Sequence, residues 1–148
     1  MSHTELIRPV HELLGRHRAN SGSKVAFRDF RRAVTYEELH LRTGRLAGHL
    51  AGLGVAPGER VVIHLGNRVE TIEGYLAVVR ASSVAVPLDP QASDAELEHF
   101  LRDSGAVLVI TDLAHLAQYE RLAWPSDRIV VAADDGSVPE GTCSYDDL

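Results

Sequence analysis

Eight histidines and one cysteine are the side chains of this sequence best suited to bind a metal ion or to act as a nucleophile and its base. No metal-ligand spacing is present among His40, His49, His64, His99 and His115. His64 lies in an apolar run, where a hydrogen-bonded core histidine is expected instead of a ligand. Cys143 lies in a polar stretch without a neighbouring base or cation to activate its thiol. These side chains therefore predict no metal site and no thiol nucleophile.

Three other patterns resemble functional motifs but lack the context that the chemistry requires. The glycines within Gly52–Gly58 follow a predicted helix instead of a strand, so they would not present N–H groups to a phosphate. Asp89 stands at a strand end, like the phospho-acceptor of a receiver domain, but the acidic pair and the lysine of that domain are missing. Ser82–Ser83 has no nucleophile-elbow pattern and no base. The sequence therefore predicts no catalytic residue.

The stretch Pro57–Pro90 predicts the structural unit that would position any functional side chain. Arg60–Leu65 and Val84–Leu88 are short apolar runs, and Val69–Ala81 between them has the spacing of an amphipathic helix. Two such runs joined by one helix predict a β-α-β unit with parallel strands and a right-handed crossover.

The same alternation of apolar runs and helices continues along the chain. Further strands are predicted at Val107–Ile110 and Ile129–Ala132, and a small hairpin at the sheet margin is predicted from Val25–Phe27 and Ala33–Thr35. The fold class is therefore α/β: a parallel-sheet subdomain with flanking helices and a marginal hairpin.

Three predicted helices begin at a capping residue that is followed three positions later by glutamate, the pattern of a capping box. The pairs are Thr35 with Glu38, Asn67 with Glu70, and Ser93 with Glu96. The last helix is expected to begin at Thr111 or Asp112 and to end near Leu122. The side chains expected to be buried on the first three are Leu39, Thr43, Leu46, Leu50 and Leu53; Val69, Ile72, Leu76 and Val79; and Leu97, Phe100 and Leu101.

The composition along the chain predicts three regions. Residues 1–23 form an N-terminal helix, Thr4–Arg18, and a linker, and residues 24–133 form the α/β subdomain. Residues 134–148 are rich in Gly, Ser, Pro and acidic residues, so we expect a loose C-terminal segment without a core element.

Charge and hydropathy exclude several classes of protein. The net charge of −6 and the lack of a basic stripe argue against nucleic-acid binding. No apolar run approaches the roughly 20 residues that span a bilayer, and Met1–Arg18 lacks the apolar core of a signal peptide. The single cysteine excludes an internal disulfide and fits a reducing compartment. We therefore expect a cytoplasmic protein that binds neither nucleic acid nor membrane.

Ligands of an open parallel sheet bind outside the carboxyl ends of its strands. Here these ends are Leu65–Arg68, Pro87–Gln91 and Thr111–His115, and all three must share one edge whatever the strand order is. We call this the carboxyl edge; it is the one site that the predicted fold favours.

Five stretches follow one another at regular intervals between about Lys24 and Asp112. They are V-A-F at Val25–Phe27, V-T-Y-E-E-L at Val34–Leu39, G-V-A-P-G-E-R-V-V-I-H-L-G-N at Gly54–Asn67, Y-L-A-V-V-R-A-S-S-V-A-V-P-L-D-P at Tyr75–Pro90, and D-S-G-A-V-L-V-I-T-D at Asp103–Asp112. Together they resemble the N-terminal part of the adenylate-forming superfamily, which includes acyl-CoA synthetases, adenylation domains and luciferases. One departure is Ala81–Ser83, where that family usually has Ala-Gly-Ala; we expect it to affect packing detail only.

The resemblance implies an acyl-activating ligase that uses ATP and Mg²⁺ to adenylate a carboxylic acid and then forms a thioester with coenzyme A or a carrier-protein phosphopantetheine. The phosphate loop of such an enzyme, with its lysine, would follow Leu148, and Lys24, the only lysine here, matches no catalytic position. The chain is therefore expected to be an N-terminal fragment that lacks the active site and is inactive alone. A free-standing α/β domain for binding or assembly, without catalysis, is the alternative.

The resemblance also implies an acceptor site and partners. In thioester-forming relatives the loop that corresponds to Asp89, Pro90 and Gln91 lies near the path of the thiol carrier, and Arg121 is a candidate phosphate contact. The alternative is that Asp89 makes a local turn, Pro90 helps to end a strand and Arg121 is solvated. The remainder of the large domain would cover apolar surface of this chain, and without it we expect self-association.

Overall fold

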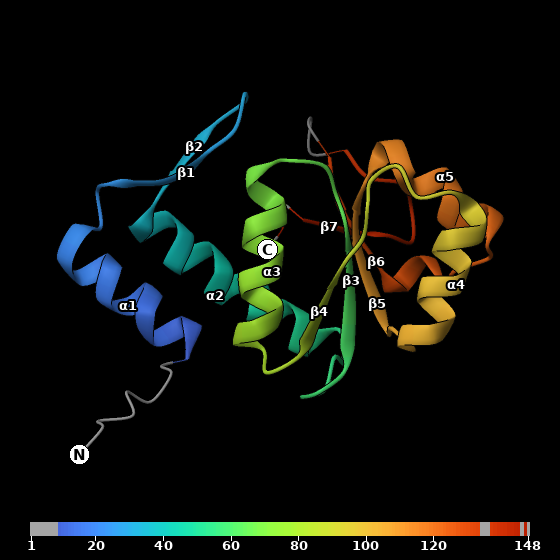
Figure 1. Ribbon diagram of the computed structural model, residues 1–148, viewed down its shortest axis with the longest axis horizontal. Coiled ribbons are helices and arrows are strands. Elements are labelled where there is room, and N and C mark those ends of the chain that lie inside the picture. Colours follow the sequence, from blue (N-terminus) through green and yellow to red (C-terminus); the bar gives the residue numbers. More distant parts are fainter. Residues whose placement is uncertain (1–8, 134–136, 146, 148) are drawn as a thin grey trace, which may run out of the picture.

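Within residues 9–133, 137–145 and 147, which the computed structural model describes, five parallel strands form one sheet in the order β4-β3-β5-β6-β7 (Figure 1). They are β3 (Arg60–His64), β4 (Val84–Pro87), β5 (Leu108–Asp112), β6 (Ile129–Ala132) and β7 (Cys143–Ser144). Helices cover both faces of this sheet. The predicted α/β fold with a parallel sheet is confirmed.

The helices form one layer on each face of the sheet. They are α1 (Val10–Ser21), α2 (Tyr36–Gly52), α3 (Val69–Arg80), α4 (Asp94–Ser104) and α5 (Leu113–Arg121), with a short 3₁₀ turn, η1 (Ser126–Arg128). Side chains of a strand point alternately to the two faces. Accordingly Val61 and Ile63 pack with α2 and α3, and Val62 packs with α4 and α5. Helix α1 lies outside the first layer, next to α2 (Figure 1).

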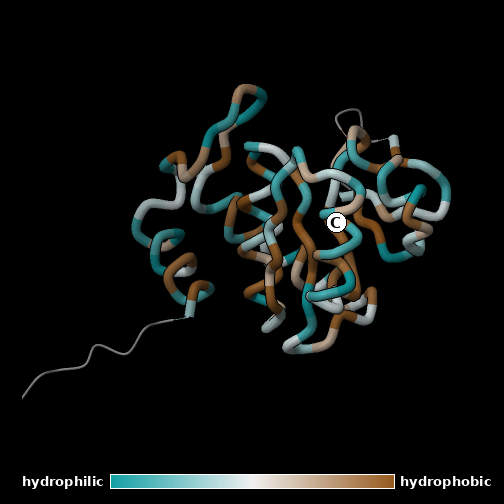
Figure 2. The backbone as a smooth tube through the Cα atoms, turned by 45° about the vertical axis from the view of Figure 1, so that its right-hand side comes forward, coloured by the Kyte–Doolittle hydropathy of each residue, from teal (hydrophilic) through white to brown (hydrophobic). Residues whose placement is uncertain are grey.

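The three inner strands are buried along almost their whole length, which explains their continuous apolar sequences. Figure 2 shows them as the hydrophobic centre of the chain. Val109 and Ile110 of β5 and Val130 of β6 are fully buried, and burial of each such side chain stabilises the fold by about 1.5–3 kcal/mol. Strand β4 lies at the sheet edge and has no fully buried residue.

The predicted hairpin is present as a sheet of its own. Strands β1 (Val25–Arg28) and β2 (Ala33–Thr35) pair antiparallel and are not hydrogen-bonded to the central sheet. The Oδ1 atom of Asp29 stabilises the turn between them, because it accepts hydrogen bonds from the backbone N–H groups of Arg31 and Arg32, both at 2.8 Å.

The N-terminal helix differs from its predicted range. Helix α1 begins directly after Pro9 and extends to Ser21, three residues beyond the predicted end at Arg18. The predicted start at Thr4 lies outside the described residues.

Two of the three predicted capping boxes are confirmed. The hydroxyls of Thr35 and Ser93 accept hydrogen bonds from the N–H groups of Glu38 and Glu96, whose carboxylates bond back to the cap. The third prediction, Asn67, is wrong. Helix α3 begins at Val69, after Arg68, whose side chain makes no capping bond.

The start of α5 and the end of α2 agree more closely with the predictions. Asp112, and not Thr111, caps α5 by accepting a hydrogen bond from the N–H of His115 at 3.3 Å. Gly54 follows α2 with a φ angle of 85°, which fits the predicted glycine at the helix end. Leu53 at the same helix end is half-buried instead of buried.

The predicted buried face of α3 is largely wrong. Val69 is buried, but Val79 is 37% exposed, and the side that faces the sheet carries Glu70, Glu73 and Gly74 together with Ala77 and Val78. A Cβ atom on Gly74 would lie 3.5 Å from Ile110 and 3.8 Å from Ile63, so a small residue lets α3 approach the sheet closely. Phe100 of α4 was also predicted to be buried and is 41% exposed.

The expectation of no core element after Asp134 is also wrong. Residues 134–136 lie outside the described part, but Cys143–Ser144 form β7, which pairs in parallel with β6. Tyr145 follows β7 and is only 4% exposed. Two residues are too short for a periodic pattern, so this strand was not visible in the sequence.

Candidate functional site

The three segments of the carboxyl edge are brought together as predicted, because β4, β3 and β5 are adjacent and parallel. Two contacts join them directly. Arg68 Nη1 lies 3.8 Å from Asp112 Oδ2, and His115 Nε2 lies 2.9 Å from the carbonyl oxygen of Pro90. The edge is therefore a connected surface instead of three independent loops.

The loop after β4 carries three of the predicted acceptor-site residues. Asp89 makes the local turn that was the alternative reading: its Oδ1 accepts from the N–H of Gln91 at 2.8 Å, and its carbonyl accepts from the N–H of Ala92 at 3.0 Å. Asp89 and Gln91 are exposed, and Pro90 is half-buried. The side chain of Gln118 in α5 donates to the carbonyl of Ala92 at 2.9 Å, which fixes the far end of the loop.

The fourth predicted residue, Arg121, lies in the last turn of α5 and pairs with Asp94, the first residue of α4. Its Nε and Nη2 atoms donate to the two carboxylate oxygens of Asp94 at 2.6 and 2.9 Å. This fork geometry lowers the pKa of Asp94 to about 2. Both side chains are largely exposed, at 56% and 41%, so a phosphate could reach Arg121 only in competition with Asp94.

A buried polar cluster lies beneath the carboxyl edge. His64 is fully buried and its Nδ1 is 2.9 Å from the hydroxyl of Tyr119, so the predicted core histidine is confirmed. Its ring centroid is 4.3 Å from that of His115, whose Nδ1 is 2.7 Å from Asp112 Oδ1. Burial, and then the charge of His115, lower the pKa of His64. Burial also raises the pKa of Tyr119.

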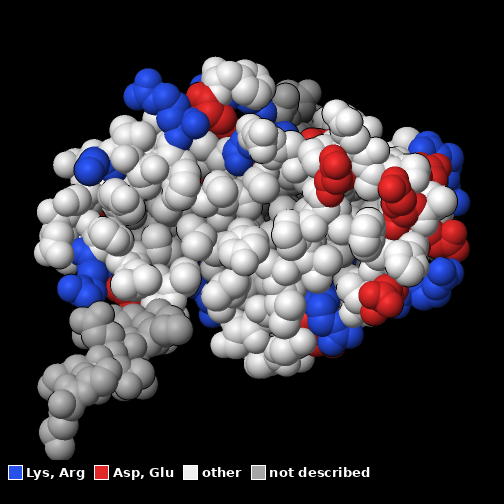
Figure 3. Space-filling model, viewed as in Figure 1, with Lys and Arg blue, Asp and Glu red and all other residues white. Residues whose placement is uncertain are grey.

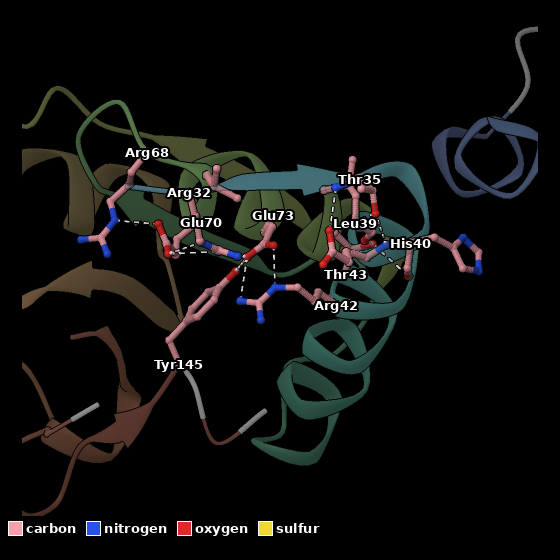
Figure 4. A network of polar contacts seen from close by, with 12 residues as sticks. Arg32, Thr35, Leu39, His40, Arg42, Thr43, Arg68, Glu70, Glu73 and Tyr145 are labelled. Carbon is pink, nitrogen blue, oxygen red and sulfur yellow. Dashed lines mark hydrogen bonds and ion pairs between the residues drawn. The ribbon is translucent and has the colours of Figure 1, made fainter. Parts of the chain in front are cut away.

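A second polar cluster, the Glu73 network, was missed by the sequence reasoning (Figure 4). Glu73 is fully buried and accepts hydrogen bonds from Arg42 Nε at 2.6 Å, Arg32 Nη2 at 3.0 Å and the Tyr145 hydroxyl at 2.9 Å. Arg32 also donates to Glu70 at 3.0 Å. The network joins the hairpin, α2, α3 and the segment after β7.

In this network the buried carboxylates of Glu70 and Glu73 are paired with arginines. Burial opposes ionisation of Glu70, but hydrogen bonds, first of all from Arg68, hold its pKa below the ordinary value. Burial, and then the charge of Glu73, raise the pKa of Tyr145 well above its ordinary value. In the sequence, the one sign of this network was the pair of glutamates inside an otherwise apolar helix. The partners of Glu73 named above are all side chains of this fold, so we interpret the network as structural.

A hollow of about 250 Å³ lies between the hairpin and the start of α3, lined among others by Phe27, Phe30 and Ile72. Two charged side chains of its wall have partners: Asp29 accepts a hydrogen bond from the backbone N–H of Val69, and Arg68 donates to Glu70. A charged ligand in this hollow would therefore have to compete with the existing partners of Asp29 and Arg68.

The described residues do not fit a nucleotide and its metal ion. In this part of the chain no group of three or more His, Cys, Asp or Glu side chains is arranged to hold a metal. The glycines with positive φ, Gly54, Gly58, Gly105 and Gly141, lie after helices or in turns, and none opens a helix as in a phosphate-binding loop. No helix among the described residues is long and apolar enough to cross a bilayer.

The model of the AMP-binding enzyme family matches residues 14–147. This chain belongs to the AMP-binding enzyme family. The predicted resemblance to the N-terminal part of an adenylate-forming enzyme is confirmed.

Relatives of this AMP-binding chain include large synthases. It is 40% identical over 129 residues to a naringenin synthase of Pestalotiopsis fici, a match that covers 87% of this chain and 5% of that protein. It is 38% identical over 135 residues to a chalcone synthase of Aspergillus candidus, covering 91% of this chain and 5% of that protein. The chain thus spans about one twentieth of the length of these relatives.

Solved structures share the fold of this AMP-binding chain. An anthranilate CoA ligase in complex with anthranoyl-AMP matches with a TM-score of 0.88 and 23% identity, over 99% of this chain and 29% of that one. A benzoate CoA ligase from Burkholderia xenovorans matches with a TM-score of 0.82 and 24% identity, over 95% and 28%. The chain therefore corresponds to less than a third of either ligase.

Proposed function

We propose that this chain is the N-terminal part of a larger acyl-activating ligase. In the proposed reaction a carboxylate oxygen of the substrate attacks the α-phosphate of ATP with Mg²⁺, and pyrophosphate leaves. A thiol sulfur then attacks the acyl carbonyl carbon, and AMP leaves. The observation that carries this proposal is the match of the AMP-binding family model over residues 14–147.

The 148-residue chain is proposed to be inactive by itself. Adenylation needs a cation clamp and hydrogen-bond donors around the triphosphate, and the described residues offer neither a metal-binding group nor a phosphate loop. ATP, Mg²⁺ and the carboxylic acid would therefore bind to the remainder of the enzyme.

The acceptor side of the proposed reaction is assigned to the carboxyl edge, with Asp89, Pro90, Gln91 and Arg121 near the thiol carrier. The exposure of Asp89, Gln91 and Arg121 supports this assignment. The acceptor is coenzyme A or a carrier-protein phosphopantetheine: the names of the fold neighbours favour the former, and the great length of the synthases favours the latter. ATP and a reduced thiol are both available in the cytoplasm, which is the compartment we propose.

The remainder of the large domain is proposed to pack on the outer apolar face, formed by Ile72, Tyr75, Val79 and Val84. In α3 the usual arrangement is reversed: Glu70 and Glu73 point inward, while Tyr75 and Val79 are 46% and 37% exposed. Val84 of β4 continues the face and is 48% exposed. Figure 3 shows mainly uncharged surface over this central part, with charged side chains gathered at the hairpin and around α4. An exposed apolar face of this kind indicates a partner surface.

The test compares a longer protein that contains this chain with the 148-residue chain alone. With a panel of carboxylic acids, the longer protein should catalyse acid-dependent exchange between ATP and pyrophosphate, and the short chain should not. Adding coenzyme A or a phosphopantetheinylated carrier protein separately should then give a thioester with one of them. A longer protein without exchange for any acid contradicts adenylation; exchange by the short chain above a heat-killed control contradicts its inactivity.

A further inference from the structure

The hairpin of β1 and β2 carries two exposed phenylalanines. Phe30, in its turn, is 89% exposed, and Phe27 of β1 is 40% exposed. Figure 1 shows the hairpin projecting above α2, and it is not hydrogen-bonded to the central sheet. Because removal of aromatic rings from water is favourable, two exposed rings on a projecting hairpin indicate a surface that a partner covers.

Polar contacts fix this hairpin against the start of α3. Asp29 accepts a hydrogen bond from the backbone N–H of Val69 at 2.8 Å, and Arg32 donates to Glu70 and to Glu73, both at 3.0 Å. An isolated two-stranded hairpin is marginally stable in water. The three bonds therefore set the position of the hairpin relative to α3, and the hollow between the two elements is part of the fold.

The hollow has the size of a side-chain site. Its volume is about 250 Å³, below the roughly 300–1,000 Å³ of pockets that bind small molecules and cofactors. Phe27 and Phe30 line it from the hairpin, and Ile72 lines it from α3. We call this hollow the hairpin socket; it fits one large apolar side chain instead of a nucleotide or a coenzyme.

Two polar residues that line the hairpin socket are exposed and have no partner within the described part of the chain. The side chains of Arg28 and Asn67 make neither a hydrogen bond nor an ion pair there. A guanidinium and an amide NH₂ group both donate to carboxylates. A segment that fills the socket is therefore expected to carry an acidic residue close to its apolar one.

The hairpin socket is continuous with the outer apolar face. Ile72 belongs to both, and Tyr75 and Val79 follow it three and seven positions later, on the same side of α3. This chain corresponds to 29% of the anthranilate CoA ligase, so more than two thirds of an enzyme of that size lies outside it. The remainder of the enzyme is therefore long enough to cover both surfaces.

We propose that the hairpin socket receives one large apolar side chain from the remainder of the enzyme, next to an acidic residue that pairs with Arg28. Insertion covers the rings of Phe27 and Phe30 and attaches the hairpin to the rest of the large domain. That such a remainder exists rests on the proposed function; the shape and exposure of the socket do not.

The three phenylalanines of this chain, Phe27, Phe30 and Phe100, are the probes for the first test. Both proteins are labelled with para-fluorophenylalanine, and Phe→Leu variants assign the fluorine NMR signals. In the 148-residue chain, at a concentration where sedimentation shows a monomer, a soluble gadolinium chelate should broaden the Phe30 signal most. Phe27 and Phe100, which are 40% and 41% exposed, should be broadened to a similar, smaller extent.

In the longer enzyme the signals of Phe27 and Phe30 should lose this broadening, because the inserted segment excludes the chelate. Broadening of both signals as strong as in the 148-residue chain overturns the proposal. This comparison of wild-type proteins requires no substitution in the socket itself, so it decides the proposal even where a socket variant fails to fold.

A variant that fills the socket tests insertion of a side chain. Ile72→Trp adds bulk to the wall of the socket and should keep the Phe30 signal broadened in the longer enzyme. Val25→Trp is the matched control, because Val25 is 42% exposed on the same hairpin and does not line the socket. It should leave Phe30 protected. Equal protection of Phe30 in two folded variants contradicts insertion into the socket.

Substitution of Arg28 tests the expected acidic residue. Arg28→Glu places a carboxylate against that residue, so it should lower the urea midpoint of the longer enzyme and leave the midpoint of the 148-residue chain unchanged. An unchanged midpoint in the longer enzyme rejects the acidic partner of Arg28.

The assay of ATP–pyrophosphate exchange separates this proposal from the proposed function. A longer protein that adenylates no acid but protects Phe27 and Phe30 contradicts the proposed function and supports the socket. A longer protein that adenylates an acid and leaves both rings exposed has the proposed function and overturns the socket. Protection of Phe30 only by self-association of the 148-residue chain would make a second copy the occupant, and this also overturns the proposal.

Discussion

Asp29 Oδ2 accepts a hydrogen bond from the backbone N–H of Val69 at 2.8 Å, so a carboxylate in the hairpin turn caps a helix that begins 40 residues later. Its other oxygen stabilises the turn itself through Arg31 and Arg32. Backbone hydrogen bonds, first from Arg32 and then from Val69, lower the pKa of Asp29 from 3.8 to about 2. One side chain therefore connects the hairpin to the central layer.

Asp29→Ala should lower the urea midpoint of unfolding near neutral pH, because it removes the cap of α3 and the turn bonds together. Asn67→Ala is the matched control and should leave the midpoint unchanged, since α3 begins after Arg68. The pKa of Asp29 is lowered on folding, so its stabilisation is present above pH 3.8 and is lost as the pH falls towards about 2. A midpoint difference that persists below that pH, or an equal effect of Asn67→Ala, would contradict the capping role.

Ser82→Gly should stabilise the fold. Ser82 has a φ angle of 60°, in the left-handed region that costs an L-residue about 1–2 kcal/mol, and it stands where the family usually has glycine. Glycine relieves this cost but loses about 0.5–1 kcal/mol through the entropy of the unfolded chain. We expect a net gain of up to about 1.5 kcal/mol in the free energy of unfolding, measured by urea titration. A loss of stability would show that the serine side chain contributes more than its backbone strain costs.

Tyr145→Phe should destabilise the protein by about 1.5–3 kcal/mol, because Glu73 loses one of its charge-assisted hydrogen bonds. Glu73→Ala should cost about 3–5 kcal/mol, because Arg32 and Arg42 lose a buried partner. The two residues should be coupled by about 0.5–3 kcal/mol in a double-mutant cycle. Tyr75→Phe, at a tyrosine that is 46% exposed, should change stability by less than about 0.5 kcal/mol. Additive effects of the two network variants would contradict a direct bond.

The 148-residue chain should self-associate through the outer apolar face. Sedimentation velocity at increasing concentration should show oligomers of the wild type and a monomer for the double variant Tyr75→Lys with Val79→Lys. Phe100→Lys is the control, because Phe100 is 41% exposed and lies on α4, on the opposite side of the sheet. A wild type that stays monomeric at high concentration, or equal dissociation by Phe100→Lys, would rule this face out.

Substitutions of Arg121 and of Asp94 should have opposite effects on KM for the thiol substrate of the longer enzyme. Arg121→Ala should raise KM for the thiol substrate about ten-fold or more without changing adenylation, if Arg121 contacts a phosphate. Asp94→Asn removes the competing carboxylate and should lower that KM. Identical KM values for both variants and the wild type would mean that the ion pair only joins α4 to α5.

The features that the sequence alone could predict depend on short-range interactions. Strand runs such as Val107–Ile110 follow from an unbroken local run of apolar side chains, and the capping boxes of Thr35 and Ser93 close within three residues. Parallel strands must share a carboxyl edge in any order, so that surface was also predictable. The ordered family motifs were enough for the assignment to adenylate-forming enzymes.

Only the tertiary structure determined the features that depend on residues far apart in the sequence. The buried face of α3 was mispredicted because a glutamate is buried only where ion-pair or hydrogen-bond partners surround it. The partners of Glu73 are Arg42, Arg32 and Tyr145, which lie 31, 41 and 72 residues away in the sequence. For the same reason the cap of α3 comes from Asp29, and the ring of His115 meets the carbonyl oxygen of Pro90, 25 residues away. A local pattern cannot contain these contacts, because folding alone brings the two partners within hydrogen-bond distance.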